Sequence, residues 1–377
     1  MTENTTTSGE SIVRQRLGEW MRGDTDSDFE ESVKRYDHYI WRKHVFMVVC
    51  IVAAILVMGA ALTLGTYPIS FFETYEIIWN HITGNIADVT ADDVIFNLRM
   101  PRIITGVVAG AGLAVAGVAM QSTLKNPLAD PYTTGVSAGA SLGATIAIVL
   151  GVNILPMGGL GIVGNAFVFS LIPTAIMVMI CRMKHASPTM MIMAGIAVMY
   201  LFSAITTMLK LWSDPDALKA LYNWEVGSLA LATWDDIVIM IPVVVIGIIV
   251  IQFLSRQLNV LATGDENAKS LGVNASQLRT ICLIVVALIA ASIVSFTGMI
   301  GFVGLVCPHV VRIIIGADNR YLVPASAAFG IALLLAADLV GRTIIAPTII
   351  QVGVITSFLG GPMFLWLLLR KKSKIWG

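Results

Sequence analysis

The sequence predicts an all-α polytopic membrane protein with about ten transmembrane helices, and three observations support this fold class. First, 56% of the 377 residues are hydrophobic and only 13% are charged, whereas a soluble domain usually carries about 25% charged residues. Second, long charge-free segments recur along the chain, and each can cross a bilayer. Third, the basic residues between these segments gather on one side. This composition excludes a soluble enzyme, a disordered chain and a nucleic-acid-binding protein.

The predicted spans follow from the charge-free segments. In chain order these are 45–72, 103–124, 131–181, 187–208, 237–254, 280–311, 322–337 and 343–369. Two of them, 131–181 and 280–311, are too long for one crossing, because about 20 residues cover a hydrocarbon core of about 30 Å. Turn-like residues at 157–161 and 295–298 divide each into two helices. The second helix of the later pair is expected to continue past Arg312.

The charges between the spans predict the orientation. An even number of spans places both termini on one side, and with the N-terminus inside, 19 of the 24 Lys and Arg residues lie on the inner side. The sequence therefore predicts an N-in, C-in protein of the cell membrane. The formal net charge is zero, so no basic excess is present to recruit nucleic acid.

The segments outside the spans have distinct characters. The outer segment 66–98 is long and acidic, and 212–236, with Trp212, Trp224 and Trp234, is typical of an interfacial helix. Small residues at four-residue spacing, including Gly106, Gly110, Gly135, Gly139 and Gly143, favour close helix packing. The four cysteines lie within apolar segments without metal-site spacing, so we interpret them as buried hydrophobes.

The sequence lacks a phosphate-binding G-x-x-x-x-G-K-[ST] loop, so ATP hydrolysis on this chain is not expected. One G-x-G-x-x-G match, at Gly159, Gly161 and Gly164, lies in an outer turn without strand context and is not interpreted as a dinucleotide site. Ionisable residues within spans are functional candidates, and here they are Asp338, Arg342 and His309. An ion-driven carrier usually shows several buried acids, so that alternative is weaker but open.

A set of motifs then resembles a known family. In chain order they are Leu-Arg-Met-Pro-Arg at 98–102, Gln121, Asn-Pro-Leu-Ala-Asp-Pro at 126–131, Gly-Val-Ser-Ala-Gly-Ala at 135–140, Gly-Asp-Glu at 264–266, Ala-Lys-Ser-Leu-Gly at 268–272, the segment 300–309, Asp338 with 341–342, and the segment 353–364. Together they resemble the FecCD-type membrane subunits, which are permeases of ABC importers for iron-siderophores, haem and cobalamin. The sequence departs from the family pattern at Ile349 and Gln351, where Glu and Pro are usual.

This resemblance implies a type II ABC importer permease of ten spans. The implied partners are a second copy of the chain, two cytoplasmic ATPase subunits that hold ATP-Mg, an extracytoplasmic binding protein and a metal-chelate substrate. No cofactor is expected on this chain. The expected domains are a cytoplasmic, amphipathic helical extension at 1–43, a permease domain at 44–372 with a coupling loop near 255–279, and a cytoplasmic tail at 373–377.

The resemblance also assigns roles to individual residues. Binding-protein docking is expected from Arg99, Arg102 and Arg342, although an Asp338–Arg342 ion pair within one helix would compete. ATPase coupling is expected from Asp265, Glu266, Ala268, Lys269, Ser270, Leu271 and Gly272, with Gly272 as the C-cap of a short helix. A possible inner gate comprises Asn126, Asp130, Ser187 and Thr189, and we interpret 126–131 mainly as a structural turn.

The sequence thus predicts the permease subunit of a binding-protein-dependent ABC importer for an iron(III)-siderophore or related metal chelate. Cobalamin or haem is the alternative substrate. An ion-gradient-driven secondary transporter is the alternative mechanism.

Overall fold

A computed structural model describes residues 25–65, 67–154, 160–184 and 188–369, and within these ranges every regular element is helical. By their internal contacts the residues form two units, Met1–Phe46 and Met47–Gly377. The boundary falls within α2 (Thr25–Thr63), which runs without interruption from the predicted extension into the first span. The extension's remaining residues lie outside the described ranges, and the predicted domain limits stay predictions.

The predicted spans are present as helices in the described ranges. Seven helical segments are long and apolar enough to cross a membrane, and they lie in α2, α5 (Met100–Leu124, extended N-terminally to Val89), α7 (Leu160–Lys184), α8 (Pro188–Leu211), α10 (Trp234–Ala262), α12 (Ala275–Thr297) and α14 (Asn319–Thr343). Three shorter apolar helices are α6 (Val136–Leu150), α13 (Val303–Ile315) and α15 (Val352–Leu369). Each predicted span therefore corresponds to one helix, which confirms the all-α polytopic fold.

The later of the two predicted interruptions is also present. Helix α12 ends at Thr297, Gly298 follows with a φ of 69°, and α13 begins at Val303. Helix α13 continues past Arg312 to Ile315, as the sequence predicts. The earlier interruption, at 157–161, lies largely outside the described residues.

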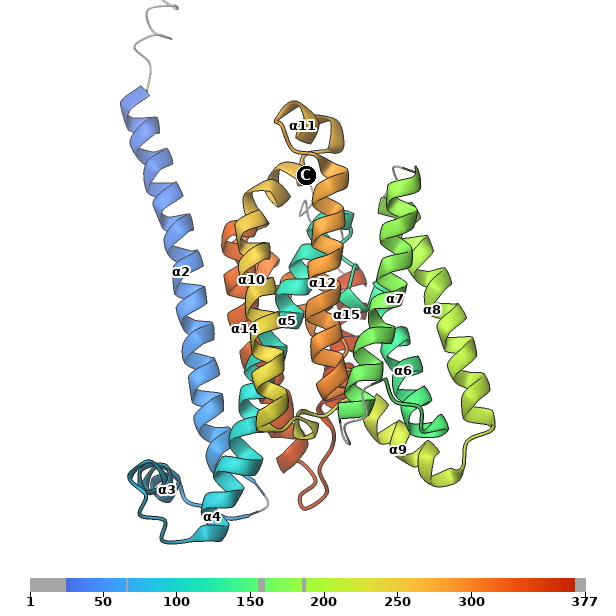
Figure 1. Cartoon of the computed structure of the whole chain (residues 1–377). Helices are drawn as coiled ribbons and strands as arrows, with labels where there is room; N and C mark the ends of the chain where they lie inside the picture. The colour runs from blue at the N-terminus through green and yellow to red at the C-terminus, as the bar shows by residue number, and fades with distance from the viewer. Residues whose placement is uncertain (1–24, 66, 155–159, 185–187, 370–377) are drawn as a thin grey trace, which may run out of the picture. The chain divides into compact units, whose positions relative to one another are not determined.

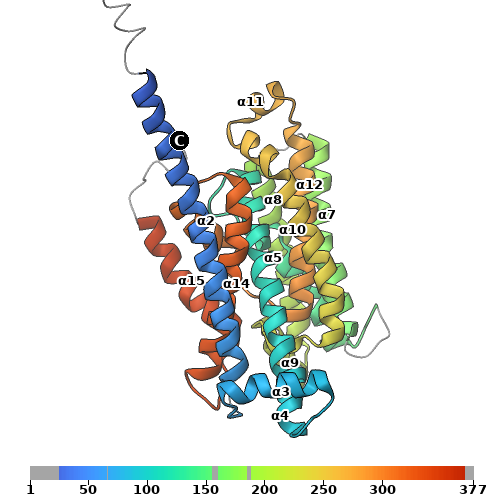
Figure 2. The same ribbon diagram turned by 90° about the vertical axis from the view of Figure 1, so that its left-hand side faces the viewer.

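Short helices occupy the two ends of the bundle (Figures 1 and 2). At one end lie α3 (Phe71–Thr83), α4 (Val89–Asp93), which continues through the π-helical η1 (Val94–Arg99), and α9 (Pro215–Glu225). At the other end lies α11 (Asp265–Ser270). Because the loop charges assign α11 to the inner side, α3, α4 and α9 belong to the outer side.

Helix α9 lies within the segment for which the sequence predicts an interfacial helix. Its Trp224 is buried, however, and packs with Leu221, Ala140, Ala144 and other apolar residues. Trp212 and Trp234 remain 71% and 39% exposed. Only the flanking tryptophans are therefore available to a membrane interface, because Trp224 belongs to the core.

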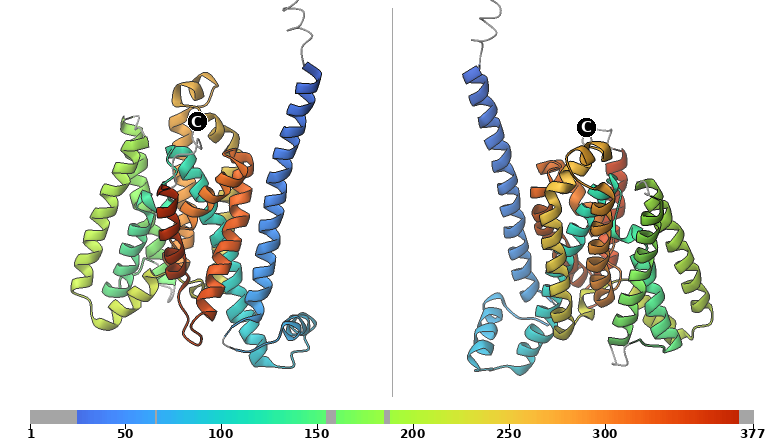
Figure 3. Two further views of the ribbon diagram at one scale, coloured as in Figure 1. Left: turned by 180° about the vertical axis from the view of Figure 1, so that it is seen from behind. Right: turned by 45° about the horizontal axis from the view of Figure 1, so that its top comes forward.

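Helix α5 lies inside the bundle, where it contacts α10, α12, α13 and α14 (Figures 1 and 3). Nearly all of its side chains are buried. Small residues permit this, because without a strong hydrophobic drive between helices in lipid, close backbone approach supplies the packing energy. A Cβ at Gly110 would lie 2.6 Å from the Gly330 carbonyl oxygen, and one at Gly139 would lie 2.3 Å from that of Phe169. These glycines pack helices together within one subunit.

The buried cysteines agree with their interpretation as small hydrophobes. Cys50, Cys282 and Cys307 are free and buried. The side chain of Cys181 lies outside those described.

Replacing Gly117 with alanine is expected to destabilise the bundle strongly. A Cβ at Gly117 would lie 1.8 Å from the Gly304 carbonyl oxygen, so α5 and α13 would have to separate. Overpacking usually costs about 1–3 kcal/mol, and a clash with backbone lies at the upper end because no side chain can rotate away. We expect a lower thermal unfolding temperature in detergent, measured by loss of the monodisperse peak in size-exclusion chromatography.

Gly361→Ala is the matched control, because a Cβ there meets no atom within 4 Å and the residue also lies in a helix. If both variants unfold at the parental temperature, the α5–α13 contact is not tight.

Candidate functional site

A cavity of about 430 Å³ lies at the outer end of the bundle and brings together the arginines singled out from the sequence. Arg99 comes from the end of η1, Arg102 from the first turn of α5 and Arg342 from the last turn of α14. The remaining lining residues are Gly65, Tyr67, Val94, Asn97, Leu98, Ala230, Ala232 and Ile349. The apolar Ile349 stands in this wall at one of the two positions where the sequence departs from the family pattern. The cavity is therefore lined by cations with no carboxylate among its lining residues.

Arg99 holds the outer end of α2. Arg99 is only 5% exposed. Its guanidinium donates to the carbonyl oxygens of Leu62 and Thr63 in the last turn of α2, and to the carbonyl oxygen of Tyr67 just beyond that helix. The last carbonyls of a helix lack partners within it, and a cation there also interacts favourably with the helix dipole. Arg99 thus closes the helix end and fixes the chain that follows it.

Asp338 is the centre of a buried charge cluster. Its carboxylate oxygen Oδ1 accepts from Arg102 Nη2 at 2.7 Å and from Arg102 Nε at 3.0 Å. Arg342 Nε lies 3.1 Å from Oδ2, one helical turn along α14, so the predicted ion pair within this helix is present. Asp338, Arg102 and Arg342 are 2%, 7% and 6% exposed. The cluster joins α5 to α14, and two guanidiniums share one carboxylate.

The inward partners of these arginines bear on the docking prediction without testing it. Arg99 and Arg102 use their guanidiniums mainly within the protein. Arg342 Nη1 donates to the Ala61 carbonyl at 3.3 Å, while its Nη2 has no hydrogen-bond partner in the described part of the chain. Arg342 therefore keeps donor capacity beside Asp338, on an Nη2 atom that is buried in the cavity wall.

The predicted coupling segment forms α11 at the inner end. The helix ends in a Schellman motif, in which the Gly272 N–H donates to the Lys269 carbonyl at 3.1 Å and the Val273 N–H donates to the Ala268 carbonyl at 2.8 Å. Gly272 has a φ of 80°, which glycine adopts without steric cost. The predicted C-cap is confirmed.

Asp265 anchors α11 to two spans. Its carboxylate accepts from Arg279 Nη1 and Nη2 at 2.8 and 2.7 Å and from Lys125 Nζ at 2.9 Å. The hydrogen bonds from Arg279 lower the pKa of Asp265 to about 2. Arg279 lies in α12 and also donates from Nε to the Thr123 carbonyl near the end of α5, at 3.3 Å. Asp265 and Arg279 thus link α11 to the end of the central helix α5 and to α12.

The coupling residues differ in what they offer a partner. Glu266, Lys269, Ser270 and Leu271 are exposed, with Leu271 67% exposed. Ala268 is fully buried and offers no surface to a partner in this structure, and its role in coupling stays a prediction. The outward surface of α11 is therefore formed by charged and polar residues around one leucine.

The predicted inner gate is brought together only in part. Asn126 Oδ1 accepts from the Leu128 N–H at 3.0 Å, and Asp130 Oδ1 accepts from the Tyr132 N–H at 2.8 Å, capping η2 (Pro131–Thr134). This confirms the structural turn. Thr189 is exposed near the start of α8, and Ser187 lies outside the described residues. The gating role stays a prediction.

A buried polar link between α5 and α13 was missed by reasoning from the sequence. Gln121 Nε2 donates to the Leu305 carbonyl at 3.1 Å, and Arg312 Nη1 donates to Gln121 Oε1 at 2.8 Å. The signal was present, since a lone glutamine stands in an otherwise small and apolar helix. Its partner is 191 positions away and could not be identified from spacing.

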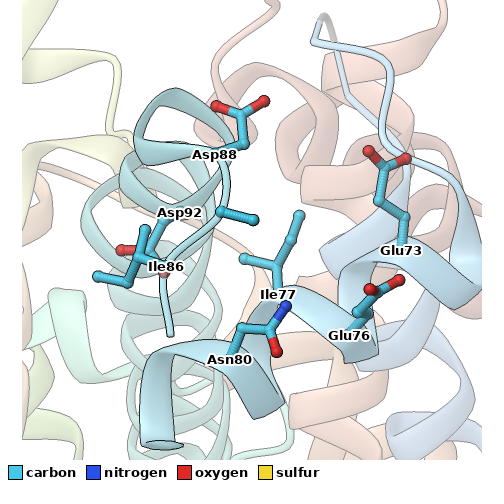
Figure 4. A pocket seen from close by; sticks show the side chains of 8 residues that line it. Glu73, Glu76, Ile77, Asn80, Ile86, Asp88 and Asp92 are labelled. Atoms are coloured by element: carbon cyan, nitrogen blue, oxygen red, sulfur yellow. The ribbon is translucent and has the colours of Figure 1, made fainter. Parts of the chain in front are cut away.

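A second outer cavity, of about 150 Å³, lies between α3 and α4 and is acidic (Figure 4). Glu73 and Glu76 come from α3, and Asp88 and Asp92 from the start of α4. Asp92 also pairs with His81 Nδ1 at 2.8 Å. Among the described residues no group of three or more His, Cys, Asp and Glu is arranged to hold a metal ion.

Comparison with known proteins gives one consistent result. A family model described as the FecCD transport family matches residues 50–370. The chain is 38% identical to the hemin transport system permease protein HmuU of Yersinia pestis, covering 86% of this chain and 95% of HmuU. It is 39% identical to the cobalamin import system permease protein BtuC of Halobacterium salinarum, covering 74% of each chain.

Two further similarities concern iron citrate and the fold itself. The chain is 33% identical to the Fe(3+)-citrate import system permease protein YfmE of Bacillus subtilis, covering 87% of this chain and 96% of YfmE. A solved metal-chelate type ABC transporter in an inward-facing conformation superposes with a TM-score of 0.75 and 28% identity. That match covers 85% of this chain and 98% of the solved chain.

Proposed function

Because the chain belongs to the FecCD transport family of multi-pass membrane permeases, we propose that it is the permease subunit of a binding-protein-dependent importer for an iron(III)-siderophore or related metal chelate. Two copies of the chain would enclose the path. Two cytoplasmic ATPase subunits holding ATP-Mg would supply the free energy, and an extracytoplasmic binding protein would deliver the chelate. This chain contributes no ATPase site in this proposal, in keeping with its lack of a phosphate-binding loop.

One observation carries this proposal furthest. Helix α11 offers an exposed surface around Leu271 on the inner side, and Asp265 ties this helix to Arg279 and Lys125 at the ends of α12 and α5. A helix that exposes one surface to a partner and is joined by ion pairs to two spans can convert movement of a bound partner into movement of those spans. An ion-driven carrier would have no evident use for it.

The charge cluster weakens the ion-driven alternative further. Asp338, the acid that such a carrier would use, is held by Arg102 and Arg342. Both carboxylate oxygens of Asp338 are occupied by arginines of the same chain, so no free acid is left there to bind a driving ion. Asp338 therefore serves as a structural counter-ion.

Haem and cobalamin remain the alternative substrates within the same class, because similar permeases are named for hemin, cobalamin and iron citrate. The iron chelate is supported by relatives named for iron citrate import and iron chelatin transport, and the metal-chelate type of the similar solved structure suits all three substrates.

Isolation of the tagged chain from its native membrane in mild detergent tests the proposal. We expect native mass spectrometry to find two copies of this chain with two copies of a P-loop ATPase, and ATP-dependent uptake of radiolabelled iron chelate after reconstitution. Recovery of the chain without an ATPase, in detergents that keep other importers intact, would exclude the importer assignment. Uptake of labelled cobalamin or haem but not iron chelate would keep the class and change the substrate.

Docking at the outer cavity gives a specific prediction for Arg342→Gln. We propose that the binding protein inserts a carboxylate into the outer cavity to pair with Arg342 Nη2, which is buried and has no hydrogen-bond partner in the described part of the chain. Because hydrogen bonds to charged groups contribute about 1.5–3 kcal/mol, we expect at least a tenfold loss of affinity for the cognate binding protein, measured by surface plasmon resonance. The affinity of the parent should fall as salt rises.

Lys219→Gln is the control for this prediction, because Lys219 is an exposed cation on outer helix α9 and does not line the cavity. Equal affinities of Arg342→Gln and the parent would remove Arg342 from the docking surface.

A further inference from the structure

Helix α3 carries an apolar face that the described part of the protein leaves uncovered. Phe72, Trp79 and Ile82 are 84%, 66% and 71% exposed, and Phe71 and Tyr75 beside them are 54% and 46% exposed. These positions recur at helical spacing and fall on one side of α3. Such a face on an outer helix requires an occupant.

The adjoining side of α3 is polar and acidic. Glu73, Glu76 and Asn80 line the acidic cavity shared with α4 (Figure 4). Helix α3 is begun by a capping box between Ser70 and Glu73, so its amphipathic character is built on a well-defined helix.

Tyr75 shows which way the apolar face points. Its hydroxyl lies 3.5 Å from the position a Cβ would take on Gly59 of α2. Gly59 precedes the end of α2 by four residues, which is roughly 6 Å along the helix axis towards the membrane centre. The face of α3 that carries Tyr75 therefore points back along α2, into the level of the bilayer.

The surface that this face adjoins is the exposed apolar side of α2. Along α2, Val48, Val52 and Leu56 are 58%, 49% and 68% exposed within the most apolar part of the span. In a membrane such side chains contact acyl chains. The apolar face of α3 continues this surface at its outer edge.

We propose that α3 lies in the outer membrane–water interface, with Phe72, Trp79 and Ile82 inserted among the lipids and the carboxylates of Glu73 and Glu76 facing out. The helix runs across the end of α2 and not along it, as an interfacial helix must (Figures 1 and 2). Aromatic rings concentrate at this level because they are apolar with a polar edge. Helix α3 thus has an uncharged apolar face towards the membrane and an acidic face away from it. A bilayer surface requires this separation of apolar and charged side chains, whereas a protein partner does not.

The anchor would fix the outer cavity as well. The segment between α2 and α3 contributes Tyr67 to the cavity wall, and Arg99 binds the Tyr67 carbonyl. An α3 held at the interface therefore keeps this wall at a constant depth while the spans move. The inference requires only that the protein spans a bilayer and does not depend on which substrate it carries.

Site-directed spin labelling of the full chain in lipid nanodiscs tests the proposal. After replacement of the four native cysteines, a nitroxide is placed at Trp79 or Ile82 on the apolar face and at Glu76 on the acidic face. These side chains are exposed, so the labels leave the fold intact, which size-exclusion chromatography verifies. Collisions with oxygen, which partitions into lipid, are compared with collisions with a water-soluble nickel chelate.

We expect labels at 79 and 82 to favour oxygen over nickel several-fold more than the label at 76 does. Equal nickel access at 79 and 76 would show that the face is in water and would overturn the proposal. Protection of label 79 from both reagents would mean that protein covers the face, either a second copy or the binding protein, and would also overturn it. As a second measurement, Trp79→Ser with Ile82→Ser should increase nickel access at a label on Phe72 several-fold, whereas Glu76→Ser should not.

Discussion

Asp338→Ala is expected to be the most destabilising single substitution among those considered. It would leave Arg102 and Arg342 buried at the outer end of the spans without their shared counter-ion. Removing one partner of a buried ion pair costs about 3–5 kcal/mol, since the remaining charge is desolvated and uncompensated. Here one carboxylate serves two guanidiniums, so the effect lies towards the upper end. Thermal unfolding in detergent should show a large decrease in the unfolding temperature or loss of folded protein.

An exposed pair provides the control. Arg320 pairs with Asp318 at 2.7 Å at the inner end of α14, with 48% of the Arg320 side chain exposed. Because solvent-exposed pairs contribute about 0–1 kcal/mol, Arg320→Ala should change the unfolding temperature far less. Equal effects of the two substitutions would contradict the central role of Asp338.

A double substitution separates lost charge from lost packing. Adding Arg102→Met to Asp338→Ala removes one of the two uncompensated cations and retains a long apolar side chain between α5 and α14. Since a buried charge without a partner is the main cost, the double variant should be more stable than Asp338→Ala alone. If it is less stable, the cluster acts mainly through packing.

Gly272→Arg is expected to abolish transport while leaving the permease folded. A Cβ at Gly272 meets no atom within 4 Å, so the only cost to folding is the left-handed conformation, about 1–2 kcal/mol for a residue with a side chain. The guanidinium, however, would project from the end of α11 beside Leu271, on the surface proposed to contact the ATPase. We expect at least a tenfold loss of ATP-dependent uptake in proteoliposomes, with ATP hydrolysis no longer stimulated by substrate-loaded binding protein.

Gly272→Asn is the matched control, because asparagine tolerates the left-handed conformation and adds no charge. It should retain most of the uptake. Normal coupled uptake by Gly272→Arg would remove α11 from the mechanism, and equal loss in both variants would assign the effect to the helix cap and not to the partner surface.

Local patterns were sufficient for much of the architecture. The charge-free segments predicted the helices because each span must satisfy its own backbone hydrogen bonds within lipid, and hydropathy reports that requirement directly. Gly298 marked the end of α12 and Gly272 the end of α11. The reason is also local, since a backbone position with a positive φ favours glycine. Trp224 shows the limit of such local patterns, because other helices can cover a tryptophan of an outer segment and spacing does not show which tryptophan they cover.

The sequence by itself therefore determined the fold class, the order of the spans and the family, since these depend on hydropathy and on motifs that are continuous in the chain. Only the tertiary structure decided how the charges are used. Arg102 and Asp338 are 236 positions apart and become partners because small residues let α5 and α14 pack closely. Likewise, Asp265 meets Lys125 140 positions away because α11 folds back over the end of α5. The identity of a charged residue is local information, but the energy of a buried charge depends on the neighbour that packing supplies.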